Sequence, residues 1–475
     1  MSRRISRRAF LDAGMVAPVV LADRARADAS LPTANGPIAD TCSDDHTFHN
    51  WARTITCRPA SYCQPENQDG VVQIVKAALS AGKRVRTVGA GHSWSPLVLT
   101  RDVLVNLDKM QQLTVDVGGR TATMQAGIRL KNLTPGLAAQ GLGLANLGSI
   151  LEQSIAGVTA TATHGTGLGI GNLSTLIIGM KLVTGSGDVV TITQADRELL
   201  DAARVSLGAL GIVTEVTLQC VADYTLEYTA YACKLDDIID RIDSLNRENT
   251  RARLWWLVPS IGPKDNVILT TMNPPGTAPG VMARSESLLT ATAQPLAPAP
   301  LPMDAEGLAS TTTLLTGNRT GCFKLLRFTG RYDQVLTVPL LPVLHRECEY
   351  AVPVGKAADA LRAFKRAIEE GDLTMKMPVE VRFVAKDQSL LSPARGTDVC
   401  YIGLSTQDNA SEVFERFEPI MRRLGGRPHW GKLFSLTRED VKAMYPDSYE
   451  TFSRIRKQLD PRGVFANELL QQLFE

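Results

Sequence analysis

The first half of the chain alternates between helical and strand-like spacing of its apolar residues. Helical spacing begins at Val71 and stops at Gly82, and a second helical run begins at Leu130 and stops at Gly141. Two strand-like runs flank the turn residues 185–188, which predicts a hairpin. This mixture of short strands and helices predicts an α+β unit. The predicted elements are helices at 71–81, 130–140 and 203–210 and strands at 85–88, 103–107, 121–126, 176–184, 189–193 and 212–221.

The second half of the chain is richer in strand-like runs. Trp255 and Trp256 lie in an apolar run that predicts a strand, and further on the alternation of polar and apolar residues is typical of an antiparallel sheet. Residues 274–302 are dense in Pro, Ala and Thr, which predicts a mobile loop. The predicted elements are strands at 253–259, 379–385 and 400–405 and a helix at 357–370.

The length of 475 residues suits two to three domains, each able to bury a core. We expect two domains and a last segment that folds back onto the first of them. The expected boundaries are a targeting segment at 1–29, a first domain at 30–223, a second domain at 224–428 and a returning C-terminal segment at 429–475.

Composition and charge exclude several partners. Lys and Arg number 51 against 49 Asp and Glu, so the net charge is only +2, and no basic stripe indicates a nucleic acid. No apolar run reaches the roughly 18 residues that a membrane span requires.

Eight cysteines permit disulfides in an exported protein but leave their pairing open. Those in strand-like runs, such as Cys220, are interpreted as small buried hydrophobic residues, and no Cys-x-x-Cys or Cys/His cluster indicates a metal.

The N-terminus has the features of an export signal. Ser6-Arg7-Arg8-Ala9-Phe10-Leu11 is typical of a twin-arginine signal, a moderately apolar stretch follows, and small residues offer a cleavage site near Ala27 or Ala29. A disordered basic arm is the alternative interpretation. The twin-arginine machinery carries folded proteins, so this signal predicts a periplasmic or secreted protein that binds its cofactor before export.

A glycine-rich loop follows the strand predicted at 85–88. Val88-Gly89-Ala90-Gly91-His92-Ser93 ends a strand in residues without large side chains, so successive backbone N–H groups are free to hold a pyrophosphate. His92 follows this turn, where a side chain can reach the ring of a cofactor. On its own Gly-x-Gly-His is a weak signal, and His92 can equally be a turn residue that caps its own loop.

A second segment, residues 147–164, is dense in Gly, Ala, Ser and Thr. A flat ring system requires close approach of the backbone, which small residues permit, and their hydroxyl groups can bond its polar edge. The alternative is a small-residue turn packed in the core of a sheet.

Two further motifs carry charge. In the strand predicted at 379–385, Glu380 and Arg382 point to one face because residues two apart share a face. An isolated Glu-x-Arg is usually a surface ion pair. Lys432, in His429-Trp430-Gly431-Lys432, is a point charge suited to stabilising negative charge on a reduced cofactor, or else a solvated residue after a turn.

Together these motifs resemble the sugar-1,4-lactone oxidase family of the vanillyl-alcohol oxidase/p-cresol methylhydroxylase flavoproteins. The resemblance also includes Gly208-Ala209-Leu210-Gly211-Ile212, Leu390-Leu391-Ser392-Pro393 and Asp460-Pro461-Arg462-Gly463. It implies a p-cresol methylhydroxylase-type FAD-binding domain and an antiparallel-sheet substrate domain. The FAD-contacting residues that it implies are Val88, Gly89, Ala90, Gly91, His92, Ser93, Gly148, Ser149, Ser154, Gly157, Thr161, Thr163, His164 and Ile212.

The resemblance also implies roles for individual residues. His92 is bonded covalently to the flavin 8α carbon, whereas Ser149, Glu380, Arg382 and Lys432 bind the substrate. Arg382 stabilises the developing oxyanion with help from Lys432. Glu380 orients the hydroxyl groups and is a candidate proton acceptor.

The implied reaction is FAD-dependent oxidation of an aldono-1,4-lactone, such as L-gulono-1,4-lactone, to a 2-keto lactone that tautomerises to an ascorbate-type product. The resemblance places Gly148 near the flavin face, where a glycine leaves a path for O₂, so we expect an oxidase that forms H₂O₂. An alditol or other sugar oxidase, and a dehydrogenase that passes electrons to a quinone or cytochrome, are the alternative enzymes. A flavin carrier without turnover is disfavoured, because storage of flavin requires none of Glu380, Arg382 and Lys432.

Overall fold

The computed structural model resolves most of the chain after residue 40. The export signal expected at 1–29 lies outside the described residues except for the backbone of Val19–Val20, and so does the Pro-rich loop from residue 278 onward. The described residues are 41–258, 260, 265–277, 322–338, 343–371, 373, 375–407 and 410–475.

A parallel sheet forms the start of the described chain. Strands β5, β7 and β6 run parallel with one another, β2 pairs antiparallel to β5, and a disulfide joins Cys42 to Cys63 across that pair. Helix α2 is capped by the Asn67 side chain and buries the apolar face expected from the sequence. The bounds are β2 (Cys42–Ser43), β5 (Ser61–Cys63), α2 (Gln68–Ser80), β6 (Val85–Val88) and β7 (Val103–Asn106), beside a small sheet of β1 (Val19–Val20), β4 (Ile55–Cys57) and β3 (Phe48–His49).

A five-stranded antiparallel sheet follows, in the order β12-β11-β13-β9-β8. It contains the predicted hairpin, in which Val183 pairs with Val189. Its strands are β8 (Leu113–Asp116), β9 (Thr121–Gln125), β11 (Ile177–Val183), β12 (Val189–Thr193) and β13 (Ile212–Gln219). The neighbouring elements are α3 (Leu130–Ala138), β10 (Leu142–Gly143), α4 (Ile155–Ala160), the 3₁₀ turn η1 (Leu173–Leu176), α5 (Arg197–Arg204) and β14 (Val221–Ala222).

The helix predicted at 203–210 is wrong. The helix in this region, α5, ends at Arg204. Leu207 has φ 56°, Gly208 has φ 65° and Gly211 has φ 159°, and none of these angles is compatible with a right-handed helix. The chain therefore turns sharply at 205–211 before it enters β13.

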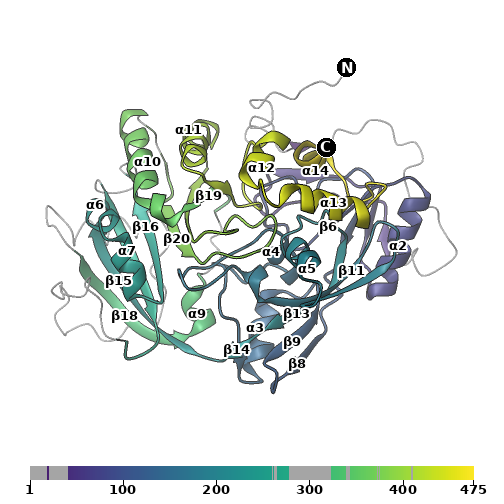
Figure 1. Ribbon diagram of the computed structural model, residues 1–475, viewed down its shortest axis with the longest axis horizontal. Helices are drawn as coiled ribbons and strands as arrows, with labels where there is room; N and C mark the ends of the chain where they lie inside the picture. Colours follow the sequence, from purple (N-terminus) through teal and green to yellow (C-terminus); the bar gives the residue numbers. More distant parts are fainter. Residues whose placement is uncertain are drawn as a thin grey trace.

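The second half of the chain builds one eight-stranded sheet in the order β18-β15-β17-β16-β20-β21-β19-β22, with antiparallel pairings throughout. Helices α10 and α11 cover one face of this sheet (Figure 1). There Phe364 packs edge-on against both Trp256 and Phe417. The strands are β15 (Thr225–Lys234), β16 (Arg251–Leu257), β17 (Asn266–Asn273), β18 (Phe323–Arg331), β19 (Arg346–Pro353), β20 (Val379–Val384), β21 (Val399–Thr406) and β22 (Arg427–Pro428). The helices are α6 (Leu235–Ile239), α7 (Ile242–Glu248), α9 (Tyr332–Leu336), η3 (Val354–Lys356), α10 (Ala357–Gly371) and α11 (Ala410–Arg423).

The C-terminal helices lie against the N-terminal sheets rather than beside the large sheet (Figure 1). The Val85 N–H donates to the Val464 carbonyl at 2.7 Å. The buried Arg86 guanidinium donates to the carbonyls of Phe465, Leu207, Gly208 and Leu97. These bonds tie the last segment to the strand that precedes the glycine-rich loop. The helices are α12 (Arg438–Met444), α13 (Tyr449–Leu459) and α14 (Glu468–Phe474).

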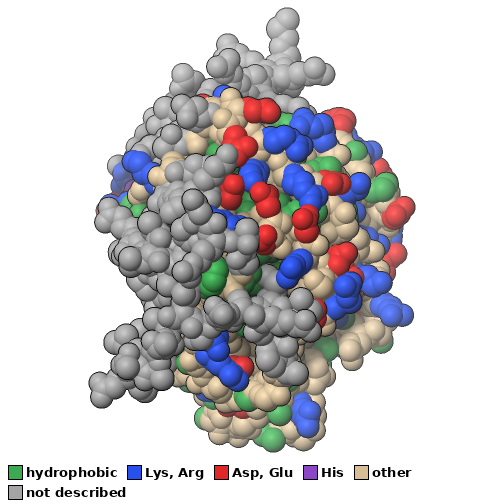
Figure 2. Space-filling view, turned by 90° about the vertical axis from the view of Figure 1, so that its left-hand side faces the viewer, with side chains coloured by type: hydrophobic (Ala, Val, Ile, Leu, Met, Phe, Trp, Pro, Cys, Tyr) green, Lys and Arg blue, Asp and Glu red, His purple; other side chains and the backbone are tan. Residues whose placement is uncertain are grey.

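Cysteines and surface charge complete the fold. A second disulfide joins Cys233 to Cys322, and Cys57, Cys220, Cys348 and Cys400 are buried free thiols, as expected for Cys220. Figure 2 shows acidic and basic side chains interspersed over the described part of one face. Within the described residues, every helix is too short or too polar to cross a bilayer.

Candidate active site

Two adjoining cavities lie inside the molecule: the first is lined by residues of the N-terminal part alone, and the second lies between that part and the large sheet. The first has a volume of about 1080 Å³ and the second about 1200 Å³, open mouths included. His92, Ser93, Gln153 and Thr161 line both cavities, so the two spaces meet at these side chains.

Each candidate residue from the sequence lines one of these cavities. The glycine-rich loop and the turn before β13 line the first, and the charged residues of the large sheet line the second. The first cavity is lined by Val88, Gly89, Ala90, Gly91, His92, Ser93, Ser154, Gly157, Thr161 and Ile212. The second is lined by His92, Ser93, Gly148, Ser149, Thr161, Thr163, His164, Glu380, Arg382 and Lys432.

The glycine-rich loop requires glycine at two of its positions. Gly91 has φ 68°, which favours glycine, and a Cβ at Gly89 would lie 2.1 Å from the Ser154 hydroxyl. The Trp51 N–H donates to the Gly91 carbonyl at 2.7 Å and fixes the loop. A bare backbone cradle that opens into a long double cavity fits the pyrophosphate and the extended shape of FAD. Residues 88–93 would hold the pyrophosphate, and the flat ring would lie toward the residues shared by both cavities.

His92 lies where the two cavities meet. Its ring stacks on Trp51, with ring centroids 5.5 Å apart. Burial, together with the nearby positive charges of Lys432 and Arg129, lowers the pKa of His92 to about 4. The imidazole is therefore neutral at physiological pH, which is the form that can act as a nucleophile.

Glu380 and Arg382 project from β20 into the second cavity, whereas Val379, Val381 and Phe383 are buried on the opposite face. Arg382 is only 8% exposed, so the pair is not a surface ion pair. Its Nη2 lies 3.3 Å from Glu380 Oε2, and its Nη1 donates to the Ser149 hydroxyl at 3.4 Å.

Strand β19 contributes two carboxylates that the sequence analysis missed. Glu349 is 2% exposed and accepts a hydrogen bond from Arg382 Nη2 at 2.7 Å. Glu347 contacts the Lys432 ammonium and also bonds His345 Nε2 at 2.8 Å. Alternation in Glu347-Cys348-Glu349 was the available signal, since residues two apart in a strand share a face.

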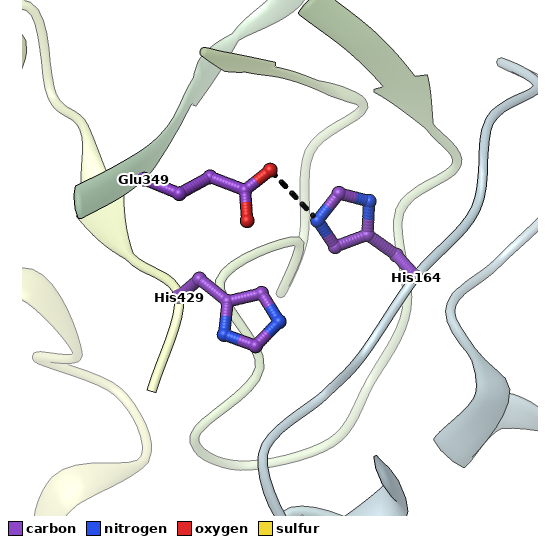
Figure 3. A group of neighbouring side chains, drawn as sticks. All are labelled: His164, Glu349 and His429. Atoms are coloured by element: carbon purple, nitrogen blue, oxygen red, sulfur yellow. Dashed lines mark ion pairs between the residues drawn. The ribbon is translucent and has the colours of Figure 1, made fainter. Parts of the chain in front are cut away.

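Glu349, His164 and His429 form a buried cluster (Figure 3). His164 Nε2 lies 3.3 Å from Glu349 Oε1, and the His164 ring stacks on Tyr401 at 3.5 Å. The three side chains are close enough to hold a metal, but their other contacts favour an ion-pair cluster. Arg382 already occupies Glu349 Oε1, and the Gly431 N–H donates to His429 Nδ1 at 3.0 Å.

Lys432 follows β22 and lies against the glycine-rich loop. The Trp94 N–H donates to the Gly431 carbonyl at 2.7 Å, which joins this motif to the residue two positions after His92. The Lys432 ammonium lies 4.3 Å from the Trp94 ring centroid and contacts Glu347. Burial lowers the pKa of Lys432 to about 7. The motif is thus built into the cavity wall and is not a solvated turn.

Comparison with protein families matches both halves of the chain. The family described as D-arabinono-1,4-lactone oxidase matches residues 216–473, and the FAD binding domain family matches residues 59–193. The chain therefore carries an FAD-binding domain.

Individual relatives match over nearly their whole length. L-gulonolactone oxidase from Bos taurus is 32% identical over 90% of this chain and 98% of its own length. L-gulono-1,4-lactone dehydrogenase from Mycobacterium tuberculosis is 32% identical over the same shares. D-arabinono-1,4-lactone oxidase from Eremothecium gossypii is 26% identical over 90% of this chain and 95% of its own length.

Solved structures confirm the predicted fold class. A His121Ala mutant of cholesterol oxidase from Brevibacterium sterolicum aligns with a TM-score of 0.77 over 94% of this chain and 100% of that chain, at 18% identity. A solvent-stable cholesterol oxidase aligns with a TM-score of 0.70 over 90% of this chain and 97% of that chain, also at 18% identity. The α+β architecture of an FAD-binding domain and a sheet domain is thus the fold of these cholesterol oxidases.

Proposed function

Because the chain belongs to the D-arabinono-1,4-lactone oxidase family, we propose that it oxidises a secondary alcohol of an aldono-1,4-lactone, such as L-gulono-1,4-lactone, to the 2-keto lactone. One observation carries the proposal. The buried Glu380–Arg382 pair lines a cavity that meets the glycine-rich cradle at His92 and Thr161, so a polyhydroxylated substrate would lie beside a flavin ring.

Bound FAD supplies the acceptor for the hydride that leaves the substrate carbon. Arg382 directs a guanidinium at the oxygen on which negative charge develops, and burial makes this charge more effective than it is in water. Glu380 orients the hydroxyl group and accepts its proton. Burial raises the pKa of Glu380, although Arg382 and Arg253 oppose that rise, and a raised pKa makes the carboxylate a stronger proton acceptor. Ser149 positions Arg382, and Lys432 adds a second positive charge.

His92 is the proposed point of covalent attachment to the flavin 8α carbon. It lines both cavities, and its low pKa keeps the ring nitrogen unprotonated for attack. A covalent bond would retain the cofactor outside the cytoplasm, which agrees with export by the twin-arginine machinery proposed from residues 1–29.

The proposed electron acceptor is O₂, with H₂O₂ as its product. Gly148 supports this choice, because the wall of the second cavity carries no side chain at that position. A Cβ at Gly148 would lie 3.1 Å from Thr163 Cγ2 and would narrow the cavity. A quinone or cytochrome acceptor is the alternative, since the relatives include enzymes named oxidase and dehydrogenase at the same identity.

The deciding experiment is a substrate panel with the purified protein. Aldono-1,4-lactones of both stereochemical series and linear alditols are added without oxygen, and bleaching of the flavin absorbance is recorded. We expect bleaching with at least one lactone, and H₂O₂ after oxygen is admitted. Bleaching by alditols alone would replace the lactone with a polyol. A flavin that no lactone or alditol bleaches would contradict the proposed function.

A further inference from the structure

Resting on the proposed function, we propose that Glu349 is a positioning residue that balances the charge of Arg382 and so leaves Glu380 as the proton acceptor. Two carboxylates surround one guanidinium in this site. The geometry gives the two carboxylates different roles, because only Glu349 is bound tightly to Arg382.

The strand register brings the two carboxylates together. On the three neighbouring strands β20, β21 and β19, Glu380 pairs with Gly403, and Gly403 pairs with Glu349. Gly403 carries no side chain, and a Cβ there would already touch Glu349 Oε1 at 3.4 Å. A longer side chain at this position would occupy the space of the carboxylate. Glycine therefore lets Arg382 reach both neighbours from the same face of the sheet.

The contacts of Arg382 are unequal. Its Nη2 donates to Glu349 Oε1 at 2.7 Å, a charge-assisted hydrogen bond, whereas Glu380 Oε2 lies farther away at 3.3 Å. The other oxygen of Glu380, Oε1, lies 3.9 Å from Arg253 Nη1. Glu380 Oε1 has no hydrogen-bond partner among the described residues, and neither has Glu349 Oε2. The two carboxylates therefore differ in how closely they bind Arg382, since each has one oxygen without a hydrogen-bond partner in the described part of the chain and Glu349 accepts the short hydrogen bond.

Neighbouring charges also move the pKa values of the two carboxyl groups apart. Glu349 faces Arg382, His164, His429 and Tyr401. Burial disfavours its ionised form, but the Arg382 guanidinium and the histidines outweigh burial and hold the pKa of Glu349 well below its usual range.

Glu380 faces Arg382, Arg253 and Glu349 itself, and burial raises its pKa. Glu349 thus remains ionised while Glu380 changes its protonation state, a divergence typical of an acid–base pair. In the reaction the C–H bond breaks as hydride to FAD, the O–H proton passes to Glu380, and a C=O bond forms.

The test is the pH dependence of kcat/KM in the holoenzyme with its best lactone. The Glu349→Gln substitution removes a negative charge next to Glu380. It also leaves Glu380 as the one carboxylate among the described residues that is paired with Arg382. Both changes lower the pKa of Glu380. The acid limb should therefore move to lower pH by roughly one unit. Glu349→Asp keeps the charge and should leave the limb within a few tenths of a unit.

Two further measurements separate this role from a structural one. Glu418→Gln removes an equally buried carboxylate, bonded to Tyr350 and outside both cavities, and should destabilise the fold without moving the acid limb. The dissociation constant of a lactone that lacks the oxidisable hydroxyl, followed by flavin absorbance, reports the same titration without turnover. It should shift with pH in parallel with kcat/KM.

Each outcome decides one point. If no lactone or alditol reduces the flavin of the wild-type protein, the proposed function is wrong. If the wild-type protein is active but the acid limb of kcat/KM is at the same pH in Glu349→Gln, the positioning role is wrong. If Glu349→Gln fails to bind FAD, Glu380→Gln supplies the test and should lose the acid limb. An acid limb that survives in Glu380→Gln would assign the proton acceptor to Glu349 instead.

Discussion

Lys432 lies over the indole of Trp94, with its ammonium 4.3 Å from the ring centroid. Trp94 follows the glycine-rich loop, and its indole N–H donates to the His345 carbonyl at 2.7 Å. One side chain therefore joins the proposed cofactor loop, the start of β19 and the C-terminal motif. A shift in any of these segments would move the positive charge of Lys432 relative to the second cavity.

The proposed covalent bond at His92 has a direct test. Denatured wild type should keep its yellow colour through acid precipitation, because a histidyl bond survives denaturation. His92→Ala removes the attacking nitrogen and should release flavin into the supernatant. The measurement is the flavin absorbance of pellet and supernatant. Free flavin from the wild type would show that attachment is noncovalent.

Arg382→Ala should lower kcat by roughly 10²–10³, as expected for loss of a preorganised charge at a developing oxyanion. Flavin content should be unchanged, since Arg382 lines only the second cavity. The matched control is Arg327→Ala, which removes an exposed arginine paired with Glu227 on β15 and should keep full activity. Turnover of Arg382→Ala within a few-fold of wild type would leave the Glu380–Arg382 pair a structural role only.

The lowered pKa of Lys432 predicts that activity falls at alkaline pH. Its pKa of about 7 means that the ammonium loses its proton as the pH rises through neutrality. If this charge supports hydride transfer, kcat should fall on the alkaline side with a midpoint near pH 7. Lys432→Arg keeps its charge at higher pH and should remove that fall. An alkaline limb identical in Lys432→Arg and wild type would assign the titration to another group.

Gly148 is the proposed path for O₂. In Gly148→Ala the added methyl group, 3.1 Å from Thr163 Cγ2, should slow reoxidation of the reduced flavin by O₂ and leave its reduction by lactone nearly unchanged. Stopped-flow absorbance measures the two steps separately. Slow reoxidation already in wild type would favour the dehydrogenase alternative, and equal rates in both proteins would remove the steric argument.

The twin-arginine signal is tested in cells. Arg7→Lys together with Arg8→Lys should retain the precursor in the cytoplasm, with flavin already bound. Immunoblots of cytoplasmic and periplasmic fractions measure the distribution, and a known periplasmic protein serves as the loading control. Normal export of the double variant would point to another route or to a basic arm without a targeting role.

The sequence by itself determined the local features of this protein. The glycine spacing at 89–91 dictates a tight backbone turn, and alternation in 379–383 places Glu380 and Arg382 on one face, because both depend on neighbouring residues only. Helix α2 and the β11–β12 hairpin were predictable for the same reason. The helix predicted at 203–210 failed because its apolar residues are buried in a turn around Gly208, which periodicity does not distinguish from a helix face.

Only the tertiary structure decided which distant charges meet. Glu349 reaches Arg382 because β21 lies between β19 and β20 and carries Gly403 at their common level. Lys432 reaches Glu347 because β22 pairs with β19 and carries the C-terminal motif back toward Trp94. Strand order and register depend on packing across the whole sheet. No local pattern specifies them, and they set the charge balance around Glu380.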